Sequence, residues 1–256
     1  MACVFARFPF AGDVKPKEIT ICGLAAVKAQ FESDPDSIKR LFFDQPTSRK
    51  VGAICKVLAQ TKRVYRCVEP AELAKVAGSI HHAGIVAVAT APELQSPDAR
   101  AIAEWARRKE PLLVLDRIGN AHNLGAIART AAFFSVSRII VPEDPAAALP
   151  GDAAHRIAEG GLSHVEILRV PVLPKFLREL AAAGYDVVGA ATRGGSLASM
   201  KRSGRPIALV MGNEEHGLAP AVLGACDRLV TLPGSGKVES LNVSVATAIL
   251  IWELLV

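Results

Sequence analysis

The chain has 256 residues, of which 50% are apolar and 21% are charged. This much apolar material can bury a sizeable core, which excludes a wholly disordered chain, and the length fits one large domain or two small ones. No apolar run approaches the ~18 residues of a membrane-spanning helix, and the N-terminal segment lacks the composition of a signal peptide. Five scattered cysteines form no Cys-x-x-Cys pair and no zinc-binding pattern. We therefore expect free thiols, a cytoplasmic location, no metal and no membrane.

The net charge of +5 lies entirely in the N-terminal third of the chain. Residues 1–91 carry 13 lysines and arginines against 8 aspartates and glutamates, whereas residues 92–256 carry 17 of each kind. A basic segment joined to a neutral one indicates that the first segment contacts a polyanion. A solvated basic face without a partner would have the same composition, so charge alone leaves both interpretations open.

The N-terminal part is predicted to be one small α/β unit over residues 18–91. Residues 1–17 show no periodicity, and we interpret them as an irregular lead-in. Hydrophobic spacing and turn residues then predict helices over 23–32, 48–60 and 70–78 and strands over 38–43, 63–68 and 84–89.

Residues 92–110 are predicted to form a linker followed by a short amphipathic helix over 98–109. The remainder, 111–256, contains apolar runs without alternation, which is typical of parallel strands covered on both faces. The runs predict strands over 112–115, 138–141, 165–168, 186–190, 207–211 and 228–232, with helices over 124–134, 174–183, 220–225 and 243–254. Such an order favours a doubly wound sheet.

Common nucleotide-binding and hydrolase motifs are absent from this second unit. No Gly-x-Gly-x-x-Gly follows its first strand, which argues against a dinucleotide fold. Residues 234–237, Gly-Ser-Gly-Lys, resemble part of a phosphate loop, but Thr231 stands where a glycine is needed and Val238 where a serine or threonine is needed. No Gly-x-Ser-x-Gly elbow is present, so a hydrolase nucleophile has no place.

Polar residues instead gather at the ends of apolar strands, where open α/β sheets bind their ligands. The first such segment is 115–130. Its Asn123 precedes an apolar helical run, and asparagine is a strong helix cap, so capping is one explanation for it. Arg129 interrupts that apolar run. An arginine on such a surface is either paired or functional.

Two further segments show the same crowding. In 208–218 a buried strand gives way to glycines that flank Glu214, and glycine allows tight turns and close approach of a ligand to the backbone. In 232–246 a long polar loop leads into the last predicted helix. Ser240 or Asn242 could be a helix cap there.

In order and spacing, these three segments resemble the three motifs of the SpoU family of RNA 2′-O-methyltransferases, also called the TrmH family, in the SPOUT class. The most specific match is Ser-Leu-Asn-Val-Ser-Val-Ala at 240–246. The resemblance implies an α/β protein with a C-terminal parallel-sheet domain, 111–256, that contains a deep trefoil knot. It also implies a small ribosomal-protein-like RNA-binding domain over 18–91, a homodimer, S-adenosyl-L-methionine as cofactor, and transfer or ribosomal RNA as substrate.

The resemblance also implies roles for individual residues. Arg129 matches the arginine that engages the target phosphate and helps to remove the proton of the ribose 2′-hydroxyl. Because arginine is charged throughout the accessible pH range, positioning of the hydroxyl beside a neutralised phosphate is the alternative to a general-base role. The family's other polar motif residues, which would orient Arg129 and the ribose, correspond to Asn123, Glu214, Ser240 and Asn242. Its cofactor-contacting positions correspond to Thr192, Met211, Gly212, Leu232 and Leu241.

The chain departs from the family pattern beside these motifs. Glu159 lies in a segment where many members carry small residues, and Phe133 and Phe134 stand where smaller residues are common. These departures concern the choice of target. A non-catalytic RNA-binding module on the same fold is the alternative function. A methyltransferase acting on a base or a protein is less favoured, because such knotted relatives lack the Ser-Leu-Asn-Val-Ser pattern.

Overall fold

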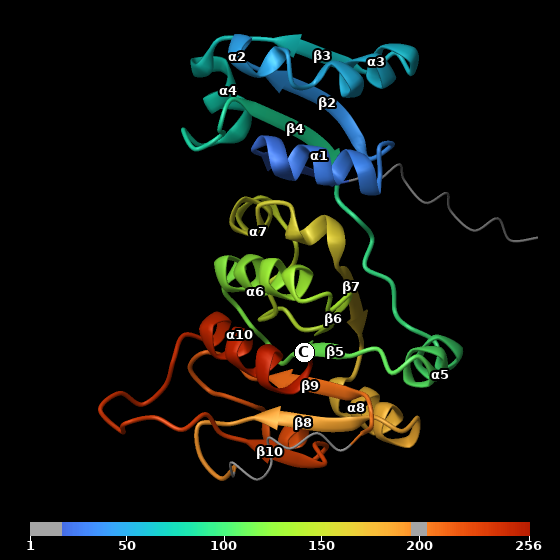
Figure 1. Cartoon of the computed structure of the whole chain (residues 1–256), viewed down its shortest axis with the longest axis vertical. Helices are drawn as coiled ribbons and strands as arrows, with labels where there is room; N and C mark the ends of the chain where they lie inside the picture. Colours follow the sequence, from blue (N-terminus) through green and yellow to red (C-terminus); the bar gives the residue numbers. More distant parts are fainter. Residues whose placement is uncertain (1–16, 196–203) are drawn as a thin grey trace, which may run out of the picture.

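The computed structural model of the protein describes residues 17–195 and 204–256. Apart from Lys17, the predicted lead-in over 1–17 lies outside the described residues. The chain folds into a four-stranded and a six-stranded sheet, one after the other in sequence (Figure 1). Within the described ranges, no helix is both long enough and apolar enough to cross a membrane.

The N-terminal part is a mixed sheet with helices on both faces (Figure 1). Its elements are β1 (Glu18–Cys22), α1 (Leu24–Ser33), β2 (Ile38–Phe43), α2 (Gln45–Ser48), α3 (Gly52–Gln60), β3 (Val64–Cys67), α4 (Pro70–Ala77) and β4 (Ile85–Thr90). The strand order is β1-β4-β2-β3, in which β4 runs antiparallel to β1 and β2. Helices α1 and α3 bury Val27 and Leu58 on one face, and α4 buries Leu73 on the other. The predicted small α/β unit is confirmed.

Two local predictions in this part were wrong. Strand β1 was not predicted, although Ile19 and Ile21 are buried on one face of it, because its alternation is only five residues long. The predicted helix over 48–60 is two helices. The first begins early because the Asp44 side chain caps it by accepting a hydrogen bond from the Thr47 backbone, and the chain then turns so that Val51 is fully buried.

The C-terminal part is a six-stranded parallel sheet, as predicted. Its elements are α5 (Ala99–Arg107), β5 (Leu112–Leu115), α6 (Ala121–Phe133), β6 (Arg138–Pro142), α7 (Asp152–Ala158), the 3-10 helix η1 (Gly161–His164), β7 (Glu166–Val170), α8 (Leu173–Ala182), β8 (Asp186–Ala190), β9 (Ile207–Met211), α9 (Pro220–Leu223), β10 (Arg228–Val230) and α10 (Val243–Leu254). The strand order is β10-β8-β9-β5-β6-β7. The neighbouring strands β5 and β9 are parallel, but the chain leaves them towards opposite edges of the sheet, to β6 and to β10. Open α/β sheets bind ligands at such a switch point.

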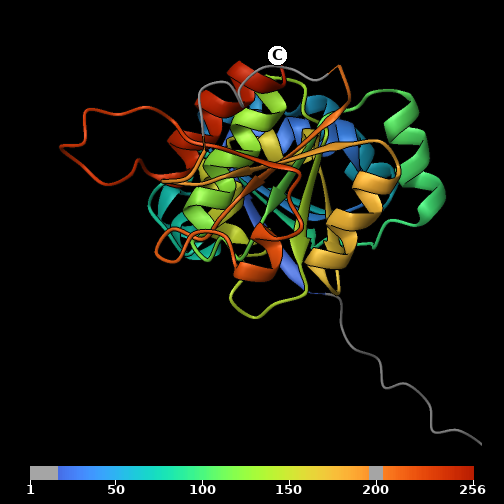
Figure 2. The same cartoon turned by 90° about the horizontal axis from the view of Figure 1, so that it is seen from below.

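Two apolar cores cover the two faces of this sheet. Helices α6 and α10 pack on one face, and α5, α8 and α9 pack on the other (Figure 2), while α7 packs on α6. This arrangement explains why the strands read as uninterrupted apolar runs.

Helix α6 begins earlier than predicted, and this changes the interpretation of Asn123. The helix starts at Ala121, and the Asn120 side chain caps it by accepting a hydrogen bond from the His122 backbone at 2.8 Å. Asn123 is therefore inside the helix and buried, and capping does not explain it.

The two parts of the chain contact one another directly. Helix α1 and strand β1 lie against α7 and η1 (Figure 1). The Thr20 backbone donates a hydrogen bond to Asp152 Oδ1 at 2.8 Å, and Ser163 Oγ donates one to Gln30 Oε1 at 3.0 Å. At Gly160 a Cβ atom would lie 3.3 Å from the Cα atom of Ala26. The contact is therefore close enough to fix the conformation of the segment after α7.

Candidate active site

The three motif segments meet at the carboxyl ends of the neighbouring strands β5 and β9. The Asp116 backbone, directly after β5, donates a hydrogen bond to the Met211 carbonyl at the end of β9. Parallel strands present all their carboxyl ends at one edge of a sheet, so the loops after these strands are brought side by side.

One buried side chain joins all three motifs. Asn123 Nδ2 donates a hydrogen bond to Glu214 Oε1 at 2.8 Å, and its Oδ1 accepts one from Asn242 Nδ2 at 3.2 Å. Asn123 is only 9% exposed. A buried amide that is satisfied on both sides fixes the relative positions of α6, the loop after β9 and the start of α10.

Glu214 and Asn242 also accept hydrogen bonds from backbone groups. Glu214 Oε2 accepts a hydrogen bond from the Gly119 backbone at 3.4 Å. Asn242 Oδ1 accepts from the Ser244 backbone at 2.9 Å and caps α10. The helix-cap explanation for Asn242 is therefore confirmed, and the same side chain also bonds to Asn123.

Two polar residues of this region, Asn213 and Asp116, were not predicted from the sequence. Asn213 Nδ2 donates to the Arg117 carbonyl at 2.7 Å, which ties the loop after β9 to the loop after β5. Asp116 is buried, accepts from the Ala219 backbone at 2.7 Å, and raises the pKa of Arg117 by a hydrogen bond. A charged residue directly after a buried strand is the signal that could have indicated Asp116.

The loop after β9 turns so tightly that a side chain at its first residue is excluded. A Cβ atom at Gly212 would lie 2.4 Å from the carbonyl carbon of Gly217, far inside contact distance. Asn213 and Gly217 exchange backbone hydrogen bonds across this turn. Glycine is therefore required at the strand end, and glycine also permits close approach of a ligand to the main chain.

The predicted cofactor residues lie in the loops after three neighbouring strands. Thr192 follows β8, Met211 is the last residue of β9 and Gly212 follows it, and Leu232 and Leu241 follow β10. The loops after β8 and β10 are joined, because the Gly195 backbone donates to Thr231 Oγ1 at 3.0 Å. Met211 is buried and Leu232 is partly buried against the core, whereas Thr192, Leu241 and Ser240 are exposed. Ser240 takes no part in the side-chain hydrogen bonds of Asn123.

Arg129 lies on α6 but is paired with a residue that the motifs do not include. Its Nη1 atom is 2.9 Å from Glu159 Oε1, and the two side chains are 56% and 62% exposed. Six residues beyond Asn123, Arg129 is ~9 Å further along the helix axis. The structure thus brings Asn123, Glu214 and Asn242 together and places Arg129 beside Glu159.

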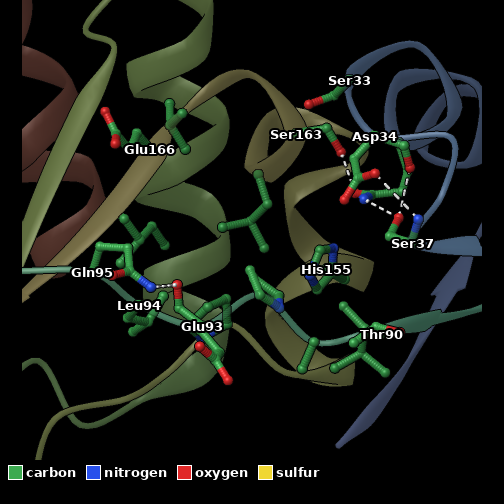
Figure 3. Close-up of a pocket in the computed structure, with 18 of the residues that line it drawn as sticks. Ser33, Asp34, Ser37, Thr90, Glu93, Leu94, Gln95, His155, Ser163 and Glu166 are labelled. Carbon is green, nitrogen blue, oxygen red and sulfur yellow. Dashed lines mark hydrogen bonds between the residues drawn. The ribbon is translucent and has the colours of Figure 1, made fainter. Parts of the chain in front are cut away.

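A separate cavity of about 500 Å³ lies between the two parts of the chain (Figure 3). Gln30, Ser37, Leu94 and His155 are among its lining residues, and none of the motif residues is. His155 Nε2 is buried without a hydrogen-bond partner among the described residues. Burial lowers the pKa of His155 to about 4, so the imidazole is neutral near pH 7. Within the described ranges, no group of three or more His, Cys, Asp or Glu residues is arranged to hold a metal ion.

Comparisons with known proteins match both parts of the chain. Residues 110–252 match the SpoU rRNA Methylase family, and residues 20–95 match the domain described as RNA 2′-O ribose methyltransferase substrate binding. The 23S rRNA (guanosine-2′-O-)-methyltransferase RlmB of Nitrosomonas europaea is 34% identical over 235 residues, which cover 91% of this chain and 89% of the relative. The uncharacterized tRNA/rRNA methyltransferase YfiF of Escherichia coli O157:H7 is 31% identical, covering 93% of this chain and 68% of the relative.

A solved structure shows the same arrangement. The AdoMet-bound rRNA methyltransferase from Sinorhizobium meliloti superposes with a TM-score of 0.74 at 25% identity, covering 93% of this chain and 86% of that one.

Proposed function

The chain belongs to the SpoU rRNA methylase family, and we propose that this RNA 2′-O-ribose methyltransferase modifies a guanosine of ribosomal RNA with S-adenosylmethionine as methyl donor. The observation that carries the proposal is the Asn123 side chain, which joins the three motif loops through Glu214 and Asn242. The choice of ribosomal RNA is supported by the RlmB relatives, which match over almost the whole chain.

The residues at the strand ends fit S-adenosylmethionine. The turn at Gly212 has no room for a side chain and leaves main-chain groups at the end of β9. Leu232 supplies apolar surface beside them, Met211 is buried at the strand end, and Thr192 and Leu241 lie in the two flanking loops. We assign cofactor binding to these five residues. When bound, S-adenosylmethionine supplies an electrophilic methyl group on a sulfonium.

Arg129 is assigned to the RNA. A ribose hydroxyl is a weak nucleophile, and an arginine is a poor base because it stays charged. The guanidinium binds the phosphate next to the target ribose through charge-assisted hydrogen bonds, neutralises its charge and holds the 2′-hydroxyl in line with the methyl group. Asn123, Glu214 and Asn242 keep the three loops in register, and the exposed Ser240 hydroxyl contacts the ribose.

We further propose that the protein is a homodimer through one face of α10. Val245, Ile249, Trp252 and Val256 recur at helical spacing and are all exposed. Phe133 at the end of α6 is 81% exposed and extends this apolar stripe through Phe134, whose ring lies 5.9 Å from that of Trp252. A contiguous apolar stripe of this kind needs cover in a soluble protein. Phe133 is one helical turn from Arg129, so the interface would border the active site.

We also propose that the two domains have different functions. Residues 18–91 bind RNA through their basic surplus, 92–110 connect, and 111–256 form the methyltransferase domain. A deep trefoil knot in that domain is supported by the family match and by the return of α10 to the first helix, where Asn242 bonds to Asn123. The four cysteines of the described ranges are free thiols, which suits a cytoplasmic location.

The test is methyl transfer from tritium-labelled S-adenosylmethionine to protein-free ribosomal RNA and, in parallel, to total transfer RNA. We expect label in ribosomal RNA, and expect R129A to lose at least about 100-fold in rate, or ~2.7 kcal/mol. Cofactor affinity of R129A should be unchanged. Binding of RNA without any transfer would favour the non-catalytic module, and a variant that kept more than a tenth of the rate would remove Arg129 from the reaction.

A further inference from the structure

The partner of Arg129 is placed where the methyltransferase would bind RNA. Glu159 Oε1 lies 2.9 Å from Arg129 Nη1, and both side chains are more than half exposed. A phosphate that reaches the guanidinium therefore meets a carboxylate already there. Two anions cannot share one side of a guanidinium without repulsion, so binding of the phosphate through that side displaces Glu159.

The backbone of Glu159 has an uncommon conformation for its residue type. Glu159 ends α7 in the left-handed region with φ of 46°. Helices commonly end in this conformation, and the residue there is usually glycine because a Cβ atom makes it unfavourable. A side chain retained in a strained backbone position is a reason to search for a function of that side chain.

The two residues after Glu159 fix the position of its backbone. A Cβ atom at Gly161 would lie 2.6 Å from the Cα atom of Arg129, so the chain touches α6 at that residue. At Gly160 the chain lies against Ala26 and Ala29 of helix α1 in the N-terminal domain. The close packing of Gly160 and Gly161 therefore places the backbone of Glu159 near Arg129, while its side chain stays 62% exposed.

We propose that Glu159 competes with RNA phosphate for Arg129. The inference rests on the proposed function of Arg129. An exposed ion pair is weak, so a phosphate delivered by a correctly docked RNA displaces the carboxylate easily. An RNA that reaches the site without the other contacts meets a neutralised arginine and a negative charge. Glu159 thus lowers the affinity of Arg129 for RNA phosphate.

The experiment compares E159Q with the matched control E166Q. Glu166 is a half-exposed glutamate of the same domain, 3.0 Å from Arg138 in an ion pair of its own. E159Q should lower KM for RNA by about twofold to fivefold, the range that an exposed pair allows, with kcat within about twofold of wild type. E166Q should leave KM unchanged, and both variants should bind S-adenosylmethionine normally.

Filter binding of RNA separates the competition from the chemistry. The gain in affinity from E159Q should disappear in the R129A background, because the carboxylate then has no arginine to occupy. A gain that persists without Arg129 would show general charge repulsion, and an E159Q variant with normal RNA affinity and lower kcat would show that Glu159 orients Arg129 productively. Either result overturns the proposal.

The second variant is E159G, which suits the left-handed backbone at this position. It should show the same gain in RNA affinity as E159Q and unfold at a higher temperature than wild type. Because filter binding needs no methyl transfer, a failure of the competition and a failure of the proposed activity are distinguishable. No loss of RNA affinity in R129A would contradict the assigned role of Arg129, whereas equal affinities of wild type, E159Q and E159G would contradict only the competition.

Discussion

Replacing Asn123 by leucine tests whether the buried amide holds the active site together. N123L keeps the size of the side chain and removes its hydrogen bonds to Glu214 and Asn242, at 2.8 and 3.2 Å. A hydrogen bond to a charged group contributes about 1.5–3 kcal/mol and a neutral one about 0.5–1.5 kcal/mol. Glu214 is exposed and regains water, so we expect a net loss of about 2 kcal/mol of unfolding free energy, or about 4–8 °C in Tm for a chain of this size.

The same substitution should affect the site more than the fold. Without Asn123, the loops that carry Gly212 and Leu241 are no longer tied to α6. We expect S-adenosylmethionine to bind at least about tenfold more weakly, or ~1.4 kcal/mol, by calorimetry, while the far-ultraviolet circular dichroism stays that of wild type. N123L could be destabilised as predicted but bind cofactor and methylate RNA normally. The Asn123 amide would then stabilise the fold only, and its assignment to the site would be wrong.

The companion variant N123D gives the prediction a pH dependence. The introduced carboxylate would lie about 2.8 Å from that of Glu214, so one of the two must take up a proton and the pKa of the introduced carboxyl is raised. The folded state then binds more protons than the unfolded state above about pH 4, and stability falls as the pH rises. N123D should therefore recover towards pH 5, where a protonated carboxyl can donate the lost hydrogen bond. N123L should show no such recovery, which separates charge from shape.

Three further predictions follow from other parts of the structure. Burial lowers the pKa of His155 to about 4, so between pH 6.5 and 4 the unfolded state binds a proton that the folded state does not. Wild type should therefore lose up to about 3 kcal/mol of unfolding free energy as the pH falls through this window. Urea titrations of H155Q should show a smaller loss, and an equal dependence of unfolding free energy on pH would contradict the assignment. Wild type should be a dimer by light scattering and W252D should raise its dissociation constant at least about 30-fold, whereas a wild-type monomer that methylates RNA would refute the interface. Removal of residues 1–91 should weaken RNA binding and reduce its salt dependence while cofactor affinity changes less than about tenfold; a truncated protein that binds and methylates RNA as well as the intact chain would refute the RNA-binding role.

The parallel sheet could be predicted from the sequence because burial on both faces leaves a local signature. Each strand is an uninterrupted apolar run, and the run is visible without knowledge of its neighbours. Helix α7 was missed for the opposite reason. Its sequence, Asp-Ala-Ala-His-Arg-Ile-Ala, has no apolar stripe of its own, and the helix depends on packing against α6 and against the N-terminal domain.

The site was predictable only in part. The family resemblance named Asn123, Glu214 and Asn242, which the structure brings together, but it did not show that the Asn123 amide bonds to both of the others. Asparagine is a common helix cap, and only the structure shows that Asn120, not Asn123, caps α6. The pairing of Arg129 with Glu159 depends on how α6 packs on α7, which no local pattern contains.

The central claim is that this chain methylates a ribose 2′-hydroxyl, and alkaline hydrolysis of the labelled RNA tests it most directly. A 2′-O-methyl group removes the nucleophile that cleaves the neighbouring phosphodiester, so label on the ribose must stay in alkali-resistant dinucleotides. We predict that wild-type protein places all of its label there, with guanosine as the modified nucleoside, and that R129A places it there at least about 100-fold more slowly. Label that appears in alkali-sensitive mononucleotides would mean methylation of a base and would contradict the account.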